Sequence, residues 1–174
     1  MPRVYRAVCE NSALPREESG GAAHLKVVDR TAIVTATPAQ MFALVDDVPR
    51  YPEFLAGCVA ARLESASAHE RVAALEIVRG GMHLEFTTRN TLSPPSQILM
   101  ELVRGPFTRL IGRWRFEPIG EQGSRVGFHV EFEFKNRLMG IALNPLFESV
   151  CDKIVDSFVV RAREVYGAAP RGGG

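Results

Sequence analysis

The segment VGFHVEFEF, residues 126–134, alternates at every position between large apolar side chains and small or polar ones. Valine or phenylalanine stands at each even-numbered position, while glycine, histidine and glutamate take the odd ones. Successive side chains of a β-strand point to opposite faces of its sheet. The alternation therefore predicts a strand with one buried face and one face in water. A sheet built from such strands needs cover on one side only.

Six further segments have strand character, and the clearest of them repeat this alternation. GMHLEFTTR (81–89) places Met82, Leu84 and Phe86 on one face, and LIGRWRFEP (110–118) turns its tryptophan to the apolar side. Strands are expected at residues 25–34, 58–65, 71–79, 81–89, 97–103, 110–118 and 126–134. Short connections between them predict a mostly antiparallel, strongly curved sheet of six to seven strands.

Two other regions have helical patterns. TPAQMFALVDD (37–47) opens with a capping threonine and a proline at the first helical position, and it is the clearer part of two short helices expected after the first strand. The same cap-then-proline pattern predicts that a long C-terminal helix starts at Asn144 and Pro145 and ends before Gly167. We expect an α+β fold in which the sheet wraps around this helix and leaves space for an internal cavity.

The length and composition fit one globular domain. The chain has 174 residues, 46% of them hydrophobic and 24% charged, with a formal net charge of +1. This balance gives no general attraction to DNA. We expect a disordered leader at 1–24, the folded domain at 25–167 and a disordered tail at 168–174. No segment approaches the roughly 18 apolar residues of a membrane span, so no span is expected. The widely separated cysteines fit a reducing compartment, and a cytoplasmic protein is expected.

The sequence lacks the motifs of the common enzyme classes. It contains no GxSxG, Walker loop, GxGxxG or HExxH motif, and its four histidines have no metal-ligand spacing. The three cysteines lie far apart with no CxxC pair, which disfavours a zinc site or a disulfide framework. Cys58 and Cys151 stand in apolar surroundings, where a thiolate is disfavoured. We therefore expect a protein that is not an enzyme and uses no metal or cofactor.

The remaining candidate for a functional site is a set of apolar side chains. DVPRYPEFLAGC (47–58) sets large apolar side chains between prolines and a glycine, and NRLMGIALNPLF (136–147) is expected to be a flexible apolar loop leading into the long helix. Two such loops beside a cavity are typical of the mouth of a site for a hydrophobic ligand. The residues expected to line the tunnel and its mouth are Tyr51, Phe54, Leu55, Phe86, Met100, Leu102, Phe107, Leu110, Trp114, Phe128, Phe132, Leu138, Met139, Leu143, Phe147 and Cys151. The alternative is a loop that plugs an ordinary core.

The basic run RGPFTRLIGRWR (104–115) offers a second possible surface. Strand alternation turns Arg109, Arg113 and Arg115 outward and the tryptophan inward, so arginine and aromatic planes cannot form one stacking platform for RNA. A solvated strand face is favoured over a nucleic-acid contact. On the same face, Glu131 and Glu133 are expected to pair with Arg113 or Arg115 rather than act as acids or bases.

One longer stretch carries a family resemblance. ATPAQMFALVDDVPRYPEFLAGC (36–58) resembles the signature segment of the coenzyme Q-binding START-like family, which includes the ribosome association toxin RatA and lies in the polyketide cyclase/dehydrase and lipid transport superfamily. The blocks at 105–118 and 126–167 match later parts of the family in the same order, so the resemblance covers about residues 26–167. One departure stands at Ala56-Gly57, where many members carry Pro-Trp.

The resemblance implies a helix-grip fold with an apolar tunnel. It implies non-enzymatic binding of ubiquinone or a similar polyprenyl or acyl lipid in support of respiratory electron transport, with transient contact to the inner membrane of a bacterium. The alternative that it implies is a translation regulator of the RatA type, which binds ribosomal subunits and blocks their association through Arg109, Arg113 and Arg115. An aromatic polyketide cyclase shares the fold and ranks last, because the inward positions are almost all apolar. The oligomeric state stays open.

Overall fold

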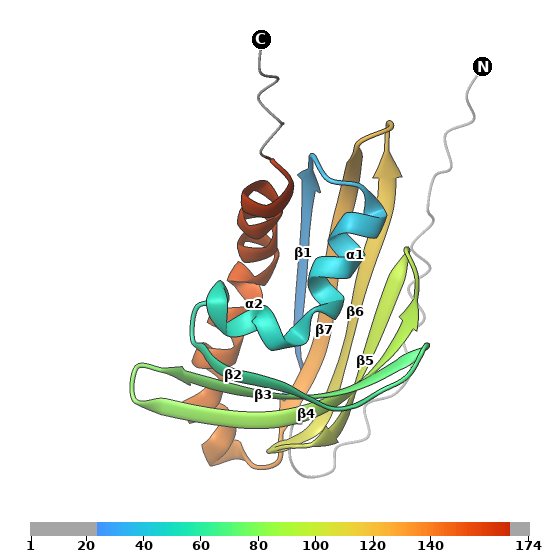
Figure 1. Cartoon of the computed structure of the whole chain (residues 1–174). Helices are drawn as coiled ribbons and strands as arrows, with labels where there is room; N and C mark the ends of the chain where they lie inside the picture. The colour runs from blue at the N-terminus through green and yellow to red at the C-terminus, as the bar shows by residue number, and fades with distance from the viewer. Residues whose placement is uncertain (1–23, 168–174) are drawn as a thin grey trace, which may run out of the picture.

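The seven segments expected to be strands pair into one antiparallel sheet in a computed structural model that describes residues 24–167 (Figure 1). The strands are β1 (Lys26–Val34), β2 (Cys58–Ala66), β3 (Glu70–Arg79), β4 (Met82–Ser93), β5 (Gln97–Arg104), β6 (Phe107–Ile119) and β7 (Gly123–Phe134). Their order across the sheet is β1-β7-β6-β5-β4-β3-β2. The expected α+β helix-grip fold is confirmed. The proposed leader and tail, and Cys9 with them, lie outside the described residues apart from His24.

The sheet bends strongly along its width. In Figure 1, β1, β7 and β6 run steeply up the view, whereas β2, β3 and β4 run nearly at right angles to them across the lower half of α2 (Arg137–Tyr166). The register shifts between Thr87 and Thr88, and again between Phe107 and Arg109, where β-bulges interrupt the pairing. A bulge bends its strand and increases the local twist. These irregularities help to turn a sheet into a half-open sleeve around the helix.

The alternation of β7 produces the expected burial. Its five even-numbered residues from Val126 to Phe134 are all buried. Antiparallel pairing sets Trp114 of β6 opposite Phe128, and their ring centroids lie 4.6 Å apart. Farther along, Phe107 stacks on Phe134 with centroids 4.5 Å apart. The concave face of the sheet therefore carries two aromatic clusters, one toward each end of β6 and β7.

The short helices after β1 form as expected. In α1 (Pro38–Asp46), the Gln40 backbone N–H donates to Thr37 Oγ1 at 3.2 Å, and the Thr37 N–H donates to Gln40 Oε1 at 2.9 Å. This reciprocal pair is a capping box, which satisfies two amides at the helix start. The second short helix, η1 (Val48–Glu53), is a 3-10 turn that contains Pro49 and Pro52.

The start of the long helix differs from the expectation. The helix α2 begins at Arg137, not at Pro145, so residues 137–144 are helical and not a flexible loop. The Asn136 side chain caps it by accepting a hydrogen bond from the Met139 N–H at 2.8 Å. Its 30 residues span about 45 Å. Packing of Leu143 and its neighbours on the sheet stabilises these turns although a proline follows in the helix interior.

Two ion pairs join α2 to the edge strand β1. Lys26 of β1 lies 3.0 Å from Glu148 of α2, and Arg30 pairs with Asp152 one turn later. These contacts fix the helix along the edge strand of the sheet. Within residues 24–167, no helix is both long enough and apolar enough to cross a membrane.

Replacement of Pro145 by alanine tests the helix start. Proline leaves the Ile141 carbonyl without its helical donor, so Pro145→Ala should raise the free energy of unfolding by about 1–3 kcal/mol, measured by urea denaturation. If the helix instead began at Pro145, the substitution would be neutral or destabilising, because proline suits a first turn. Pro38→Ala, at the first position of α1, is the matched control and should give no such gain.

Candidate functional site

A small cavity lies between α2 and the concave face of the sheet. Its volume is about 80 Å³, and its wall is almost wholly apolar. Strands β3 to β7 supply the floor, η1 and the turn after it supply one end, and α2 supplies the roof. The predicted residues that line it are Tyr51, Leu55, Phe86, Met100, Leu110, Trp114, Phe128, Phe147 and Cys151.

The other predicted residues lie elsewhere. Phe107, Phe132 and Leu143 are buried in the surrounding core, while Phe54, Leu102 and Met139 are half-buried beside it. The expectation that Leu138 faces the interior is wrong. Leu138 is 80% exposed, because helix formation at 137–144 turns its side chain away from the sheet.

Sequence reasoning missed part of the wall. Leu75 and Ile77 of β3, Val130 of β7, and Thr88, Gly112, Val150 and Ile154 also line the cavity. The alternation of β3 and β7 could have identified the first three. No sequence pattern marked Gly112 as part of the cavity wall. A side chain at this position would collide with Met100, since a Cβ here would lie 2.3 Å from the Met100 Cε. Glycine thus lets Met100 lie flat across the floor of the cavity.

The segment expected to form the mouth, around Tyr51 to Leu55, is closed and held in place by hydrogen bonds and aromatic packing. The Tyr51 hydroxyl donates to the Val45 carbonyl at 2.5 Å, and the Leu55 N–H donates to the Tyr51 carbonyl at 2.8 Å. Phe54 packs edge-on against Phe158 of α2, with ring centroids 5.0 Å apart. Tyr51 and Leu55 therefore close one end of the cavity, while Phe54 attaches that end to the helix.

The departure at Ala56-Gly57 has a local structural reason. Gly57 has φ of +87°, and its carbonyl accepts a hydrogen bond from the Val78 N–H at 2.8 Å. A side chain at this left-handed position would be strained. The turn from η1 into β2 is therefore built for glycine, and no bulky gate residue stands at position 57.

The polar groups at the cavity are already hydrogen-bonded. Thr88 donates to Asn90 Oδ1 at 2.8 Å, and the Tyr51 hydroxyl is used as described above. Burial raises the pKa of the Cys151 thiol, and burial also raises the pKa of Cys58, close to this end, to about 11. Both thiols are neutral near pH 7, so neither is an activated nucleophile. Among residues 24–167, no group of histidine, cysteine or carboxylate side chains could hold a metal ion.

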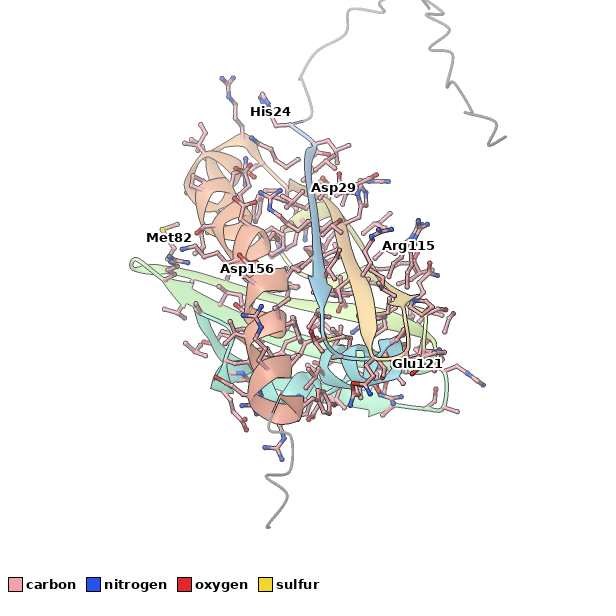
Figure 2. The ribbon with its side chains drawn as sticks, turned by 90° about the horizontal axis from the view of Figure 1, so that it is seen from above. His24, Asp29, Met82, Arg115, Glu121 and Asp156 are labelled. Atoms are coloured by element: carbon pink, nitrogen blue, oxygen red, sulfur yellow. The ribbon has the colours of Figure 1, made fainter. Side chains whose placement is uncertain are left out.

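A second hollow of about 360 Å³ lies on the convex face, over β1, β7 and β6. It forms above Gly127, which stands between Thr31 and Arg115 in the strand register and has no side chain to fill the space. Arg113 and Arg115 border it and make no ion pair with any residue between 24 and 167. Figure 2 shows Arg115 on the side of the sheet turned away from α2.

The expected pairing of the outer charges is wrong in one respect. Arg109, and not Arg113 or Arg115, binds Glu131, through Nη2 at 2.7 Å and Nε at 3.0 Å. The pair runs diagonally between β6 and β7, so residue alternation alone does not identify it. Arg109 is thus neutralised, and Arg113 and Arg115 keep their charge for a partner.

Comparison with known proteins identifies the family. A family model described as polyketide cyclase/dehydrase and lipid transport matches residues 34–159. The ribosome association toxin RatA of Escherichia coli K12 is 42% identical over 141 residues, which are 81% of this chain and 89% of that protein. The chain belongs to the polyketide cyclase/dehydrase and lipid transport family. The resemblance found in residues 36–58 is confirmed.

Two further similarities extend the comparison. The mitochondrial coenzyme Q-binding protein COQ10 of Drosophila melanogaster is 28% identical over 131 residues, 73% of this chain and 54% of that protein. The crystal structure of the ZhuI aromatase/cyclase from Streptomyces sp. R1128 superposes with a TM-score of 0.72 at 17% identity, over 87% of this chain and 100% of that one. At this identity the likeness shows the polyketide cyclase/dehydrase fold alone.

The outer face has a pH-dependent contact. His129 Nδ1 lies 2.6 Å from Asp29 Oδ1, and its Nε2 lies 3.4 Å from Glu131 Oε1, so these carboxylates raise the His129 pKa above its usual value. A raised pKa in the folded state stabilises the protein below pH 6.5, and this contribution disappears as the pH rises through the folded-state pKa.

His129→Gln should therefore lower the free energy of unfolding more at pH 5.5–6 than at pH 9. The difference should stay below about 1 kcal/mol because the pair is largely exposed. Urea denaturation at the two pH values measures it. An equal loss at both would mean that the charge on His129 contributes nothing.

Proposed function

We propose that the protein binds a hydrophobic ligand of the quinone or polyprenyl class between α2 and the sheet, without transforming it. The apolar wall of the cavity carries this proposal. Its two hydroxyl groups already donate to protein acceptors, and its thiol is neutral. Such a wall attracts apolar surface and offers no acid, base or nucleophile. The similar protein COQ10 is named a coenzyme Q-binding protein, and the family model is named in part for lipid transport. Both names support a lipid-like ligand.

The ligand must enlarge the cavity in order to enter. A volume of about 80 Å³ is well below the ~300–1,000 Å³ of ordinary ligand sites. Met100, Leu75 and Ile154 are half-buried and line the wall, so they are the side chains that can move with least loss of packing. Methionine in particular adapts to irregular shapes.

The free-energy balance favours a ligand with a long apolar chain. Burial of about 300 Å² of apolar ligand surface yields about 7.5 kcal/mol at ~25 cal/mol per Å². Association itself costs about 4–15 kcal/mol, and opening of the cavity adds to this cost. A bare ring therefore binds poorly, whereas each added CH₂ group that leaves water contributes about 0.8 kcal/mol.

Gly112→Val tests the cavity directly. The valine side chain would displace Met100 into the cavity and occupy part of the space that the ligand needs. We expect at least about tenfold weaker uptake of a short-chain ubiquinone, measured by titration with native mass spectrometry, while the strand keeps its fold because valine suits a β-strand.

Gly127→Ala is the matched control. It adds a methyl group to the opposite face of the sheet, where a Cβ would meet only the Arg115 Cβ at 3.9 Å. This variant should bind like the wild type. Uptake of the quinone by the Gly112→Val variant with unchanged affinity would overturn the proposal, as would a wild-type protein that carries no lipid from its host and takes up none.

A second candidate function rests on the convex face. Arg113 and Arg115 beside Gly127 have no ion-pair partner within the described part of the chain and present positive charge to a polyanion. Several relatives named ribosome association toxin RatA are 42% identical to this chain. We propose on this ground that Arg113 and Arg115 contact ribosomal RNA phosphates in a role that limits subunit association. Such contacts weaken steeply with salt, because binding releases counterions.

The double variant Arg113→Glu with Arg115→Glu should abolish any effect of the protein on the association of purified ribosomal subunits, followed by gradient sedimentation. Arg163→Glu, which reverses another exposed arginine on α2, should leave that effect unchanged. Quinone uptake should survive in both variants. An effect that persists in the double variant would exclude this face as the contact.

A further inference from the structure

The first turns of α2 carry large apolar side chains both on the side packed against the core and on the side in solvent. Between Arg137 and Glu148, the ten residues 138–147 contain no charge. Leu143, Leu146 and Phe147 pack into the core. The opposite side of the same turns has no part of the described chain packed over its largest side chains. A surface helix of a globular protein normally has one apolar face, so a second apolar face on the same turns needs cover of its own.

The uncovered residues form one stripe. Leu138, Ile141, Ala142 and Pro145 follow helical spacing of three and four, and all four are exposed. The exposed fractions of Leu138 and Ile141 are 80% and 66%. Scattered apolar residues on a surface need no explanation, but a contiguous stripe marks a contact site.

Positive charge borders this stripe. A groove of about 850 Å³ runs between the start of β1, the end of β7 and the start of α2, and Ile141 forms part of its wall. Lys135 and Arg137 line it and make no ion pair with any residue between 24 and 167, while Glu133 is the single carboxylate in the lining. His24 and the first turns of α2 lie at this same end of the molecule (Figure 2).

We propose that this end of α2, the stripe together with Lys135 and Arg137, docks onto an anionic lipid bilayer. Leu138 and Ile141 would enter the boundary between headgroups and acyl chains, and the two cations would meet lipid phosphates. A second copy of the chain fits less well, because a stable dimer buries about 800 Å² per partner and a four-residue stripe offers much less.

The link to the cavity rests on the proposed function. Phe147 lies nine residues after Leu138 in the same helix, about 14 Å along its axis, and is part of the cavity wall. Docking would therefore bring the bilayer to the end of the helix that roofs the cavity. The docking itself does not depend on a ligand and is measured with the empty protein.

Vesicle flotation tests the proposal. The wild-type protein should float with vesicles of equal parts phosphatidylglycerol and phosphatidylcholine at low ionic strength, and much less with phosphatidylcholine alone. The double variant Leu138→Glu with Ile141→Glu should bind the anionic vesicles at least about tenfold more weakly, since two apolar side chains no longer leave water. Lys135→Glu should lower binding about fivefold or more and reduce the preference for anionic lipid.

The matched control is Ile33→Glu. Ile33 is also 66% exposed, and it lies at the far end of β1 from the groove. It should float like the wild type. Equal flotation of the Leu138→Glu, Ile141→Glu variant and the wild type would overturn the proposal, as would a wild type that ignores anionic vesicles. A wild-type dimer that the double variant abolishes, without vesicle binding, would instead assign the stripe to a second copy.

Uptake of short-chain quinone in the absence of vesicles separates this proposal from the cavity proposal. The Leu138→Glu, Ile141→Glu variant should retain that uptake, because neither residue lines the cavity. Conversely, the Gly112→Val variant should lose quinone uptake and still float with anionic vesicles. The two proposals can therefore fail independently.

Discussion

The ring of Phe158 joins the helix, the sheet and the closed end of the cavity. It is 0% exposed, and its centroid lies 5.1 Å from Trp114, 5.4 Å from Tyr51 and 5.0 Å from Phe54. Each of these edge-to-face contacts adds about 0.5–1.5 kcal/mol beyond the burial of area. Through this one side chain, α2 is held against β6 and η1 together. The packing of Phe158 therefore sets both the position of α2 over the cavity and the closure of the cavity by η1.

The cavity follows from the mismatch between a wide curved sheet and one covering helix. Bulges in β5 and β6 bend the strands away from a flat layer, and α2 crosses the resulting curved sheet on one side. Aromatic side chains fill most of the remaining space, but Gly112 removes one side chain from the floor and Met100 replaces it loosely. At this point of the floor the cavity is bordered by the flexible thioether of Met100. A branched side chain at position 112 would have filled the space.

Most of the fold could be predicted from the sequence, because strand alternation and the cap at Thr37 are local signals. The start of α2 could not, since Pro145 is a strong local signal that packing on the sheet overrides. The misplacement of Leu138 in the tunnel followed directly from this error. The ion pair of Arg109 with Glu131 was missed for another reason: a diagonal contact depends on side-chain reach across the strands, which alternation does not determine.

The cavity and the hollow on the convex face share two strands, β6 and β7. Along β6 and β7, Trp114 and Phe128 face the cavity, while their neighbours Arg113 and His129 face water on the other side. The pleat thus separates an apolar site from a charged one by a single residue step. Phe128 is the one described residue that lines both surfaces. A ligand that spreads β6 and β7 from within would also move Arg113 and Arg115 of β6 away from His129 and Gly127 of β7. Any coupling between the two sites must therefore pass through the strand pairing itself.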